Sequence, residues 1–138
     1  MRRTVIILGL TLAVGIVCGA LGERLLSAQQ QPVKRTELLK TDLEGIAEKE
    51  GVMYLAELAP GAAAGKHFHP GPEFAYVLEG SLILEPQGKP PLTIKAGEAF
   101  HNASKIVHDA KNASTTAPTK VLVFLVADKG QPLATPVQ

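Results

Sequence analysis

Cysteine and tryptophan are almost absent from this sequence. Its 138 residues include no tryptophan and one cysteine, Cys18, which lies in an apolar stretch near the amino terminus. The rest of the chain therefore has no thiol for a disulfide or a thiolate metal ligand. Any metal bound there must use nitrogen and oxygen donors. The low aromatic content, 4%, also disfavours a carbohydrate-binding platform.

A marked excess of either charge is missing as well. Fourteen basic and 13 acidic residues give a formal net charge of +1, and the basic residues are scattered along the chain. This pattern lacks the basic footprint of a nucleic-acid-binding protein, so we expect no nucleic-acid partner. The length of 138 residues and the hydrophobic fraction of 46% predict one domain with a compact core.

The amino terminus carries the one long apolar run. Arg2 and Arg3 precede an uncharged stretch from Thr4 to Gly22. A basic front edge followed by an apolar run is typical of an export segment, but this run is longer than a usual signal-peptide core and close to the ~20 residues that span a bilayer. We therefore interpret residues 1–28 as a cleaved signal peptide or a retained membrane-anchor helix rather than as a buried helix of the domain. In both cases we expect a periplasmic or extracellular protein, with the basic end left on the cytoplasmic side.

The remaining chain has the pattern of an all-β protein. We assign residues 29–50 to a linker that can contain an edge strand, 51–130 to a barrel, and 131–138 to a C-terminal tail. Residues 35–40 resemble a strand, whereas 41–44 resemble a helix-starting capping box, and both readings stay open. No amphipathic helix is evident after residue 51, and closely spaced Gly and Pro turns favour a sandwich or barrel. Strands are predicted at 52–58, 66–69, 73–78, 81–85, 92–94, 99–102, 107–111 and 120–127.

Two histidines and a carboxylate lie within seven residues. On a strand, His67 and His69 would point to the same face because alternate side chains share a face. Glu73 follows the turn at 70–72, and we expect the two segments to form a hairpin that brings the three donors together. In the strand 73–78, Glu73 shares its face with apolar residues, and the opposite face is apolar too. We expect one face to line the barrel and the other to pack under a neighbouring sheet.

A buried carboxylate on an apolar face needs a partner for its charge. A metal ion would supply that partner. The local pattern therefore predicts a metal site built on the segment from residue 61 to residue 80.

This segment resembles the first motif of the cupin superfamily, G-x5-H-x-H-x3-E-x6-G. The motif positions are filled by Gly61, His67, His69, Glu73 and Gly80. A second segment resembles the second cupin motif, G-x5-P-x-G-x2-H-x3-N, with Gly97, His108 and Asn112 in register. It departs from the motif at Ala103 and Lys105, which replace the proline and the second glycine. The turn before His108 can therefore differ in shape.

The resemblance to small single-domain cupins of the "cupin 2" type implies a jelly-roll barrel, also called a double-stranded β-helix, with a metal near one mouth. Carried over by position, it implies His67, His69, Glu73 and His108 as ligands and a structural role for Asn112. Three imidazoles and a carboxylate suit one divalent transition metal, whether Mn, Fe, Ni, Co, Cu or Zn. Fewer than six protein ligands would leave positions open for a substrate or O₂.

Three functions fit this ligand set. The first is a metal-dependent, dioxygenase-type enzyme acting on a small organic molecule, with Glu73 as a catalytic proton acceptor or donor. The second is a metal-dependent isomerase or lyase, and the third is a non-catalytic protein that binds or senses a small molecule or the metal. We also expect a homodimer that pairs through edge strands.

Four other residues can be weighed in the same way. His101 has no motif position, so we interpret it as a surface or rim histidine rather than a fifth ligand. Lys105 could reach an anionic substrate, although a solvated loop lysine is the simpler interpretation. Tyr54 and Tyr76 are interpreted as packing residues.

Overall fold

The computed structural model describes residues 32–137. The apolar run at the amino terminus, and with it the predicted signal peptide or anchor helix, lies outside the described residues. Those residues form strands, turns and loops without a helix, so none of their segments is a helix that could span a membrane. The prediction of an all-β fold is confirmed for this part of the chain.

Ten strands follow one another along the chain, and each of the eight strands predicted from residue 52 onward overlaps one of them. The open alternative at 35–44 is decided in favour of a strand, which runs to Asp42 with no helix start. A short strand in the predicted C-terminal tail was not expected. The strands are β1 (Val33–Asp42), β2 (Lys49–Leu58), β3 (His67–Phe68), β4 (Glu73–Glu79), β5 (Ser81–Pro86), β6 (Leu92–Lys95), β7 (Ala99–Asn102), β8 (His108–Asn112), β9 (Thr119–Asp128) and β10 (Thr135–Pro136).

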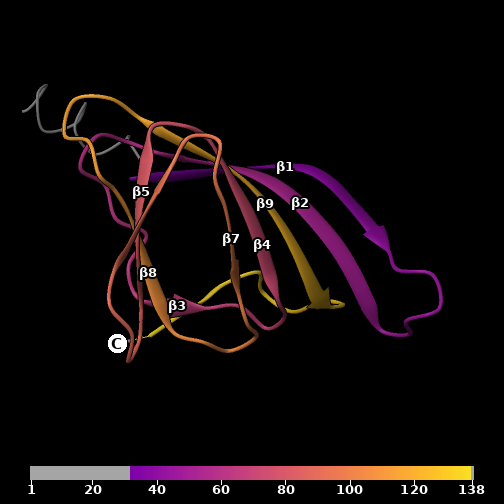
Figure 1. Ribbon diagram of the computed structural model, residues 1–138. Helices are drawn as coiled ribbons and strands as arrows, with labels where there is room; N and C mark the ends of the chain where they lie inside the picture. Colours follow the sequence, from indigo (N-terminus) through magenta and orange to yellow (C-terminus); the bar gives the residue numbers. More distant parts are fainter. Residues whose placement is uncertain (1–31, 138) are drawn as a thin grey trace, which may run out of the picture. The chain divides into compact units, whose positions relative to one another are not determined.

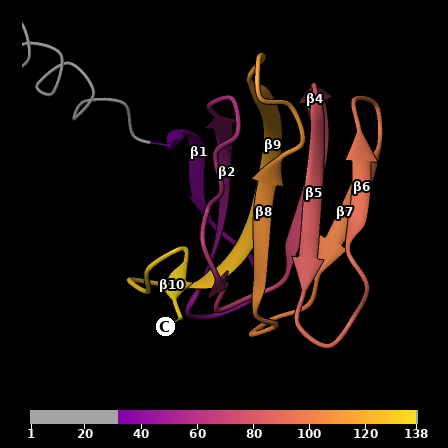
Figure 2. The ribbon, with the colours of Figure 1, turned by 90° about the vertical axis from the view of Figure 1, so that its left-hand side faces the viewer.

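Two antiparallel five-stranded sheets face each other (Figures 1 and 2). The first sheet has the order β1-β2-β9-β4-β7, and the second has the order β10-β3-β8-β5-β6. In Figure 1 the second sheet, with β5 and β8, lies on the left and the first sheet lies on the right. The core fills the space between them, as expected for a double-sheet jelly-roll barrel.

Period-two alternation of buried and exposed residues explains why these segments pack as strands. Along β9 every second residue is buried, from Thr119 to Ala127, and the second half of β2 alternates in the same way. The facing side chains Val52, Val77, Leu82 and Leu125 are at most 1% exposed. Each such side chain stabilises the fold by roughly 1.5–3 kcal/mol relative to leaving it in water.

The expected hairpin at residues 66–78 is wrong. His67 lies on β3 in the second sheet, whereas Glu73 begins β4 in the first sheet, and these two strands do not pair. The segment Pro70–Pro72 carries the chain from one sheet to the other. It passes so close to β9 that a Cβ on Gly71 would lie 1.5 Å from the Val126 carbonyl oxygen. Only glycine fits there, because any larger residue would push the crossing away from the sheet.

The prediction that the outer face of β4 packs under a neighbouring sheet is also wrong. Ala75 and Val77 face the core as predicted, but Phe74 and Tyr76 are 49% and 44% exposed. No second layer covers this face among residues 32–137. The first sheet therefore presents aromatic side chains to its surroundings, a feature that is unusual for an isolated soluble domain.

Asn112 connects three segments at the end of the barrel far from the histidines. Its side-chain oxygen accepts hydrogen bonds of 2.8 Å from the Ser114 N–H and from the Thr119 hydroxyl. Its amide group donates to carbonyl oxygens of Leu58, Ala59 and Ala117 at 2.8–3.2 Å. Because Asn112 is 6% exposed, these bonds satisfy polar atoms that water cannot reach. The side chain has a structural role in this arrangement.

Candidate metal centre

Three histidines meet at one end of the barrel. His67 lies on β3 and His69 follows two residues later, so both imidazoles point to the same side. His67 pairs across the sheet with His108, the first residue of β8. All three are buried, at 3–6% exposure, and one ring nitrogen from each lies within 4.8 Å of the others. This arrangement joins the two sequence motifs in one cluster.

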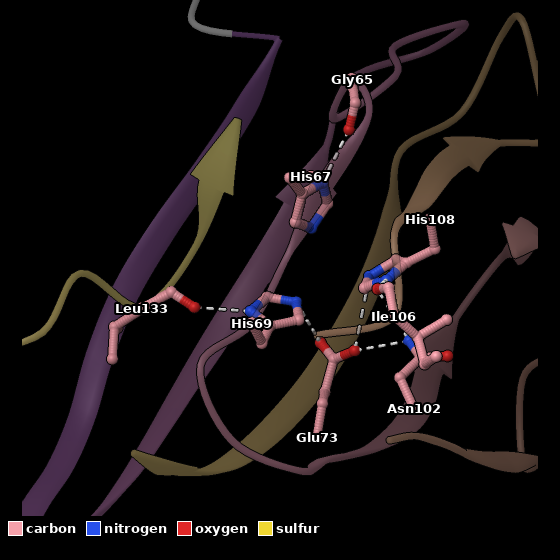
Figure 3. A network of polar contacts seen from close by, with 8 residues as sticks. All are labelled: Gly65, His67, His69, Glu73, Asn102, Ile106, His108 and Leu133. Carbon is pink, nitrogen blue, oxygen red and sulfur yellow. Dashed lines mark hydrogen bonds and ion pairs between the residues drawn. The ribbon is translucent and has the colours of Figure 1, made fainter. Parts of the chain in front are cut away.

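Each imidazole is oriented by its backbone surroundings (Figure 3). The Nδ1 atoms of His67, His69 and His108 lie 2.6, 2.6 and 3.0 Å from the carbonyl oxygens of Gly65, Leu133 and Ile106. A carbonyl oxygen can only accept, so Nδ1 carries the hydrogen in each ring. Each Nε2 then carries a lone pair, and that of His108 accepts a long hydrogen bond of 3.4 Å from the Asn102 amide. Bonds from Nδ1 to a carbonyl oxygen hold metal-binding histidines in the correct tautomer.

Glu73 enters the cluster from the other sheet. Its Oε1 lies 3.3 Å from His69 Nε2, and its Oε2 lies 3.7 Å from His108 Nε2. Asn102 donates a 2.7 Å hydrogen bond to Oε2. Figure 3 shows the carboxylate between His69 on one side and His108 with Asn102 on the other. The carboxylate therefore lies at the border of the cluster. The three histidine nitrogens lie within 4.8 Å of one another without counting Glu73.

Burial lowers the pKa values of His67 and His108, because a charged imidazole is poorly solvated there. Both rings are thus kept neutral, the form that binds metals. For His69 burial also acts to lower the pKa, but the nearby Glu73 carboxylate outweighs it and the pKa is raised. Burial acts to raise the pKa of Glu73, and His69 and Asn102 outweigh it in the same way, so that pKa is lowered.

A buried nitrogen of His69 has no hydrogen-bond partner among the described residues. This atom, Nε2, lies without a hydrogen-bond donor, and the polar atom at 3.3 Å from it, Glu73 Oε1, belongs to a carboxylate. Buried polar atoms in proteins are nearly always satisfied. Together with the two neighbouring Nε2 atoms, this nitrogen fits a divalent transition metal, and the three histidines are positioned to bind one.

The turn before His108 keeps a glycine-like shape although the motif glycine is replaced. Lys105 has a φ of 61°, in the left-handed region that favours glycine. Its N–H donates a 2.9 Å hydrogen bond to the carbonyl oxygen of His69. The net gain from such a bond, about 1 kcal/mol, is similar to the ~1–2 kcal/mol that the conformation costs. The bond also ties the second motif to the first.

A cavity of about 40 Å³ lies between the sheets beside the cluster. His67 and Glu73 line it on the side of the cluster, and most of the remaining lining is apolar, from both sheets. A volume of this size holds about three water-sized groups. A small ligand could therefore contact the cluster and the apolar walls together.

Other residues singled out in the sequence lie away from the cluster. His101 is exposed on the outer face of the first sheet, where its ring lies 4.9 Å from that of Phe74. Lys105 is exposed in its turn and does not line the cavity. Tyr76 points outward, whereas Tyr54 is buried and lines the cavity.

Asn102 was missed by the sequence analysis because no motif position marks it. The alternation of β7 could have indicated it, since the residue after an outward His101 must point inward.

Comparison with known families agrees with this geometry. The cupin domain family matches residues 54–125, more than half of the chain. This chain belongs to the cupin family. No curated protein matches this cupin.

Solved structures of low sequence identity share the fold. A cupin-like protein from Thermotoga maritima is 23% identical, with a TM-score of 0.61, and the match covers 76% of this chain and 75% of that one. The lyase DddQ from Ruegeria pomeroyi, a DMSP lyase, is 18% identical with a TM-score of 0.63, over 77% of this chain and 52% of the other. An oxalate oxidase in complex with the substrate analogue glycolate is 22% identical with a TM-score of 0.62, over 77% and 55%.

Alanine at a cluster histidine should abolish tight metal binding. We expect His67→Ala and His108→Ala each to weaken the affinity for Zn²⁺ or Mn²⁺ by more than about a hundredfold, since losing even an outer-shell partner costs 10–100-fold. His101→Ala is the matched control and should bind as the parent does, because its ring faces away from the cluster. Chelator-competition titration and elemental analysis measure both quantities. A parent protein with metal far below one per chain after reconstitution would contradict the metal site.

Proposed function

We propose that this cupin holds one divalent transition metal through His67, His69, His108 and Glu73 and acts as a metal-dependent oxygenase on a small organic substrate. The observation that carries the proposal is the set of three histidines, each with one ring nitrogen within 4.8 Å of the others, beside a cavity. A bound metal would supply Lewis acidity or redox chemistry toward a substrate or O₂. With four protein ligands, positions on the metal stay open for that purpose.

Glu73 is the residue we propose to move a proton during turnover. Its carboxylate borders the cavity, so it can reach a ligand bound there. Asn102 donates to Oε2 and would hold the carboxylate in position as its proton content changes. The same carboxylate would serve as the fourth ligand, because its oxygens lie 3.3 and 3.7 Å from the Nε2 atoms of His69 and His108.

The cavity limits the substrate to a small molecule. Its walls are mostly apolar, and about 40 Å³ accommodates only a few heavy atoms. Two proteins of this fold also act on small compounds according to their names, an oxalate oxidase and a DMSP lyase. A lyase reaction is therefore the second candidate, and a binding or sensing protein is the third.

We also propose export to the periplasm or the cell exterior, with or without a membrane tether. The support is the sequence alone: Arg2 and Arg3 ahead of the apolar run from Thr4 to Gly22.

A homodimer is the assembly we propose. The cross-strand neighbours Leu39, Met53, Phe124 and Phe74 form a continuous apolar row over the outer face of the first sheet. A second row joins Leu55, Leu122 and Tyr76. The adjoining edge strand β1 is exposed except at Val33. A second copy of this face would cover the apolar rows. The free edge at β1 could also pair with the β1 of a second copy.

Oxygen uptake tests the proposed reaction. Protein loaded with Fe²⁺, Mn²⁺ or Ni²⁺ should consume O₂ with at least one member of a panel of small diketones, thiols and hydroxy acids, as measured with an oxygen electrode. His67→Ala should abolish the uptake, and His101→Ala should retain it. Product formation without O₂ consumption would replace the oxygenase with a lyase or isomerase. Silence across the panel would favour a binding protein.

Light scattering in solution tests the dimer. The parent should have the mass of two chains, and Phe74→Glu together with Phe124→Glu should shift it to one, since two carboxylates would be buried in the interface. Leu92→Glu is the control, because Leu92 is 54% exposed on the second sheet and should leave the dimer intact. A monomeric parent would contradict this assembly.

Cell fractionation tests export. The full chain should occur in the periplasmic or membrane fraction of a bacterial host, and a variant lacking residues 1–28 should stay in the cytosol. Full-length protein found only in the cytosol would overturn the proposal.

A further inference from the structure

Arg35 faces the cavity from the first sheet. It lies two residues after the buried Val33 on β1, and both side chains line the cavity together with Tyr54, His67 and Glu73. Arg35 is nevertheless exposed, so it lies where the cavity opens to solvent. Of the described residues that line the cavity, it is the single lysine or arginine.

Arg35 also differs from its neighbours in having no carboxylate partner within residues 32–137. The adjacent Lys34, which points to the opposite face, pairs with Glu57 at 3.6 Å, and Lys40 pairs with Glu50 at 2.9 Å. A guanidinium group presents a planar set of donors that matches a carboxylate in a two-point contact. Arg35 thus places an anion-binding group without a carboxylate partner at the mouth of the cavity, beside the Tyr54 hydroxyl.

Tyr54 adds a second donor to this region. It is 4% exposed, and burial, together with the charge of Glu73, raises the pKa of its hydroxyl well above the usual value. The hydroxyl therefore keeps its hydrogen and can donate to an oxygen of a ligand.

The net positive charge of the proposed metal centre also favours an anionic ligand. A divalent ion with three neutral imidazoles and the Glu73 carboxylate would carry one net positive charge, and Arg35 adds a second. In a partly buried space, an anionic ligand group would offset this charge. The walls farther inside, which include Ala56, Ala64 and Ala110, suit a short apolar body.

We infer that Arg35 binds the carboxylate of a short aliphatic acid whose apolar body occupies the cavity beside the histidine cluster. The inference rests on the proposed function, of which it specifies the substrate class. It also replaces Lys105, the lysine considered from the sequence, with a residue that lines the cavity.

Calorimetric titration of the Zn²⁺-loaded protein with propionate, and with propionamide as its neutral counterpart, tests the inference. The parent should bind propionate at least about tenfold more tightly than propionamide, because hydrogen bonds between charged groups are about twice as strong as neutral ones. Arg35→Met should weaken propionate binding by about tenfold or more. Arg35→Lys should lie between the two, since a point charge replaces the two-point contact.

Lys34→Met is the matched control, because it removes a positive charge from the same strand on the opposite face. It should bind propionate as the parent does. Parent-like propionate binding in Arg35→Met, or equal affinity of the parent for the acid and the amide, would overturn the inference. The comparison of acid and amide uses the parent alone, so equal affinities would overturn the inference even if a variant misfolds.

Metal content separates this inference from the proposed function. One Zn²⁺ per chain without propionate binding would overturn the role of Arg35 and leave the metal centre standing. Failure to bind metal, combined with propionate binding that depends on Arg35, would support the anion site and overturn the proposed enzyme.

Discussion

A carboxylate held among three buried imidazoles is the contact around which this barrel is arranged. Glu73 is 5% exposed, and an ionised carboxylate without partners would cost several kcal/mol at such a site. His69, His108 and Asn102 meet that demand from three different segments. Their positions depend in turn on backbone carbonyl oxygens that hold each imidazole by Nδ1. The orientation of the imidazoles is thus fixed by the backbone of loops next to β3, β8 and β10.

The two sheets can supply one cluster because the chain changes sheet between the ligands. Pro70–Pro72 crosses against β9, where Gly71 leaves no room for a side chain. The turn at Lys105 adds a second link through its bond to the His69 carbonyl. A strained φ at a non-glycine residue is tolerated because its surroundings hold it, as is common near functional sites. Both loops therefore help to bring the ligands of the two sheets together.

The same barrel has two apolar regions with different consequences. The inner one is closed by packing except for the small cavity beside the cluster, where a reacting molecule would be shielded from water. The outer one, over β2, β9 and β4, has no covering layer among residues 32–137, and it is the face that the proposed dimer would bury. Because the inner and outer residues of a strand alternate, one set of strands can provide both a site and an assembly surface.

Much of the local structure could be predicted from the sequence. Alternating apolar residues and Gly or Pro turns gave the strands, and the spacing of His67 and His69 set both imidazoles on one side. The resemblance of Gly97, His108 and Asn112 to the second cupin motif distinguished His108 from His101 despite the missing motif glycine. These features are local, since a strand's own geometry decides which side chains share a face.

Other features were decided by tertiary structure alone. The alternation of buried and exposed residues shows that a segment is a strand but not which sheet it joins. Glu73 was therefore predicted on a hairpin with the histidines, whereas it lies on the other sheet. The alternation also does not say what covers a face, so the exposed Phe74 was not foreseen. Asn102 and Arg35 gain their importance from segments far away in the chain. The sequence by itself determined the donors and their spacing, whereas the packing of the two sheets decided which groups meet, because contacts between distant strands depend on register and crossing.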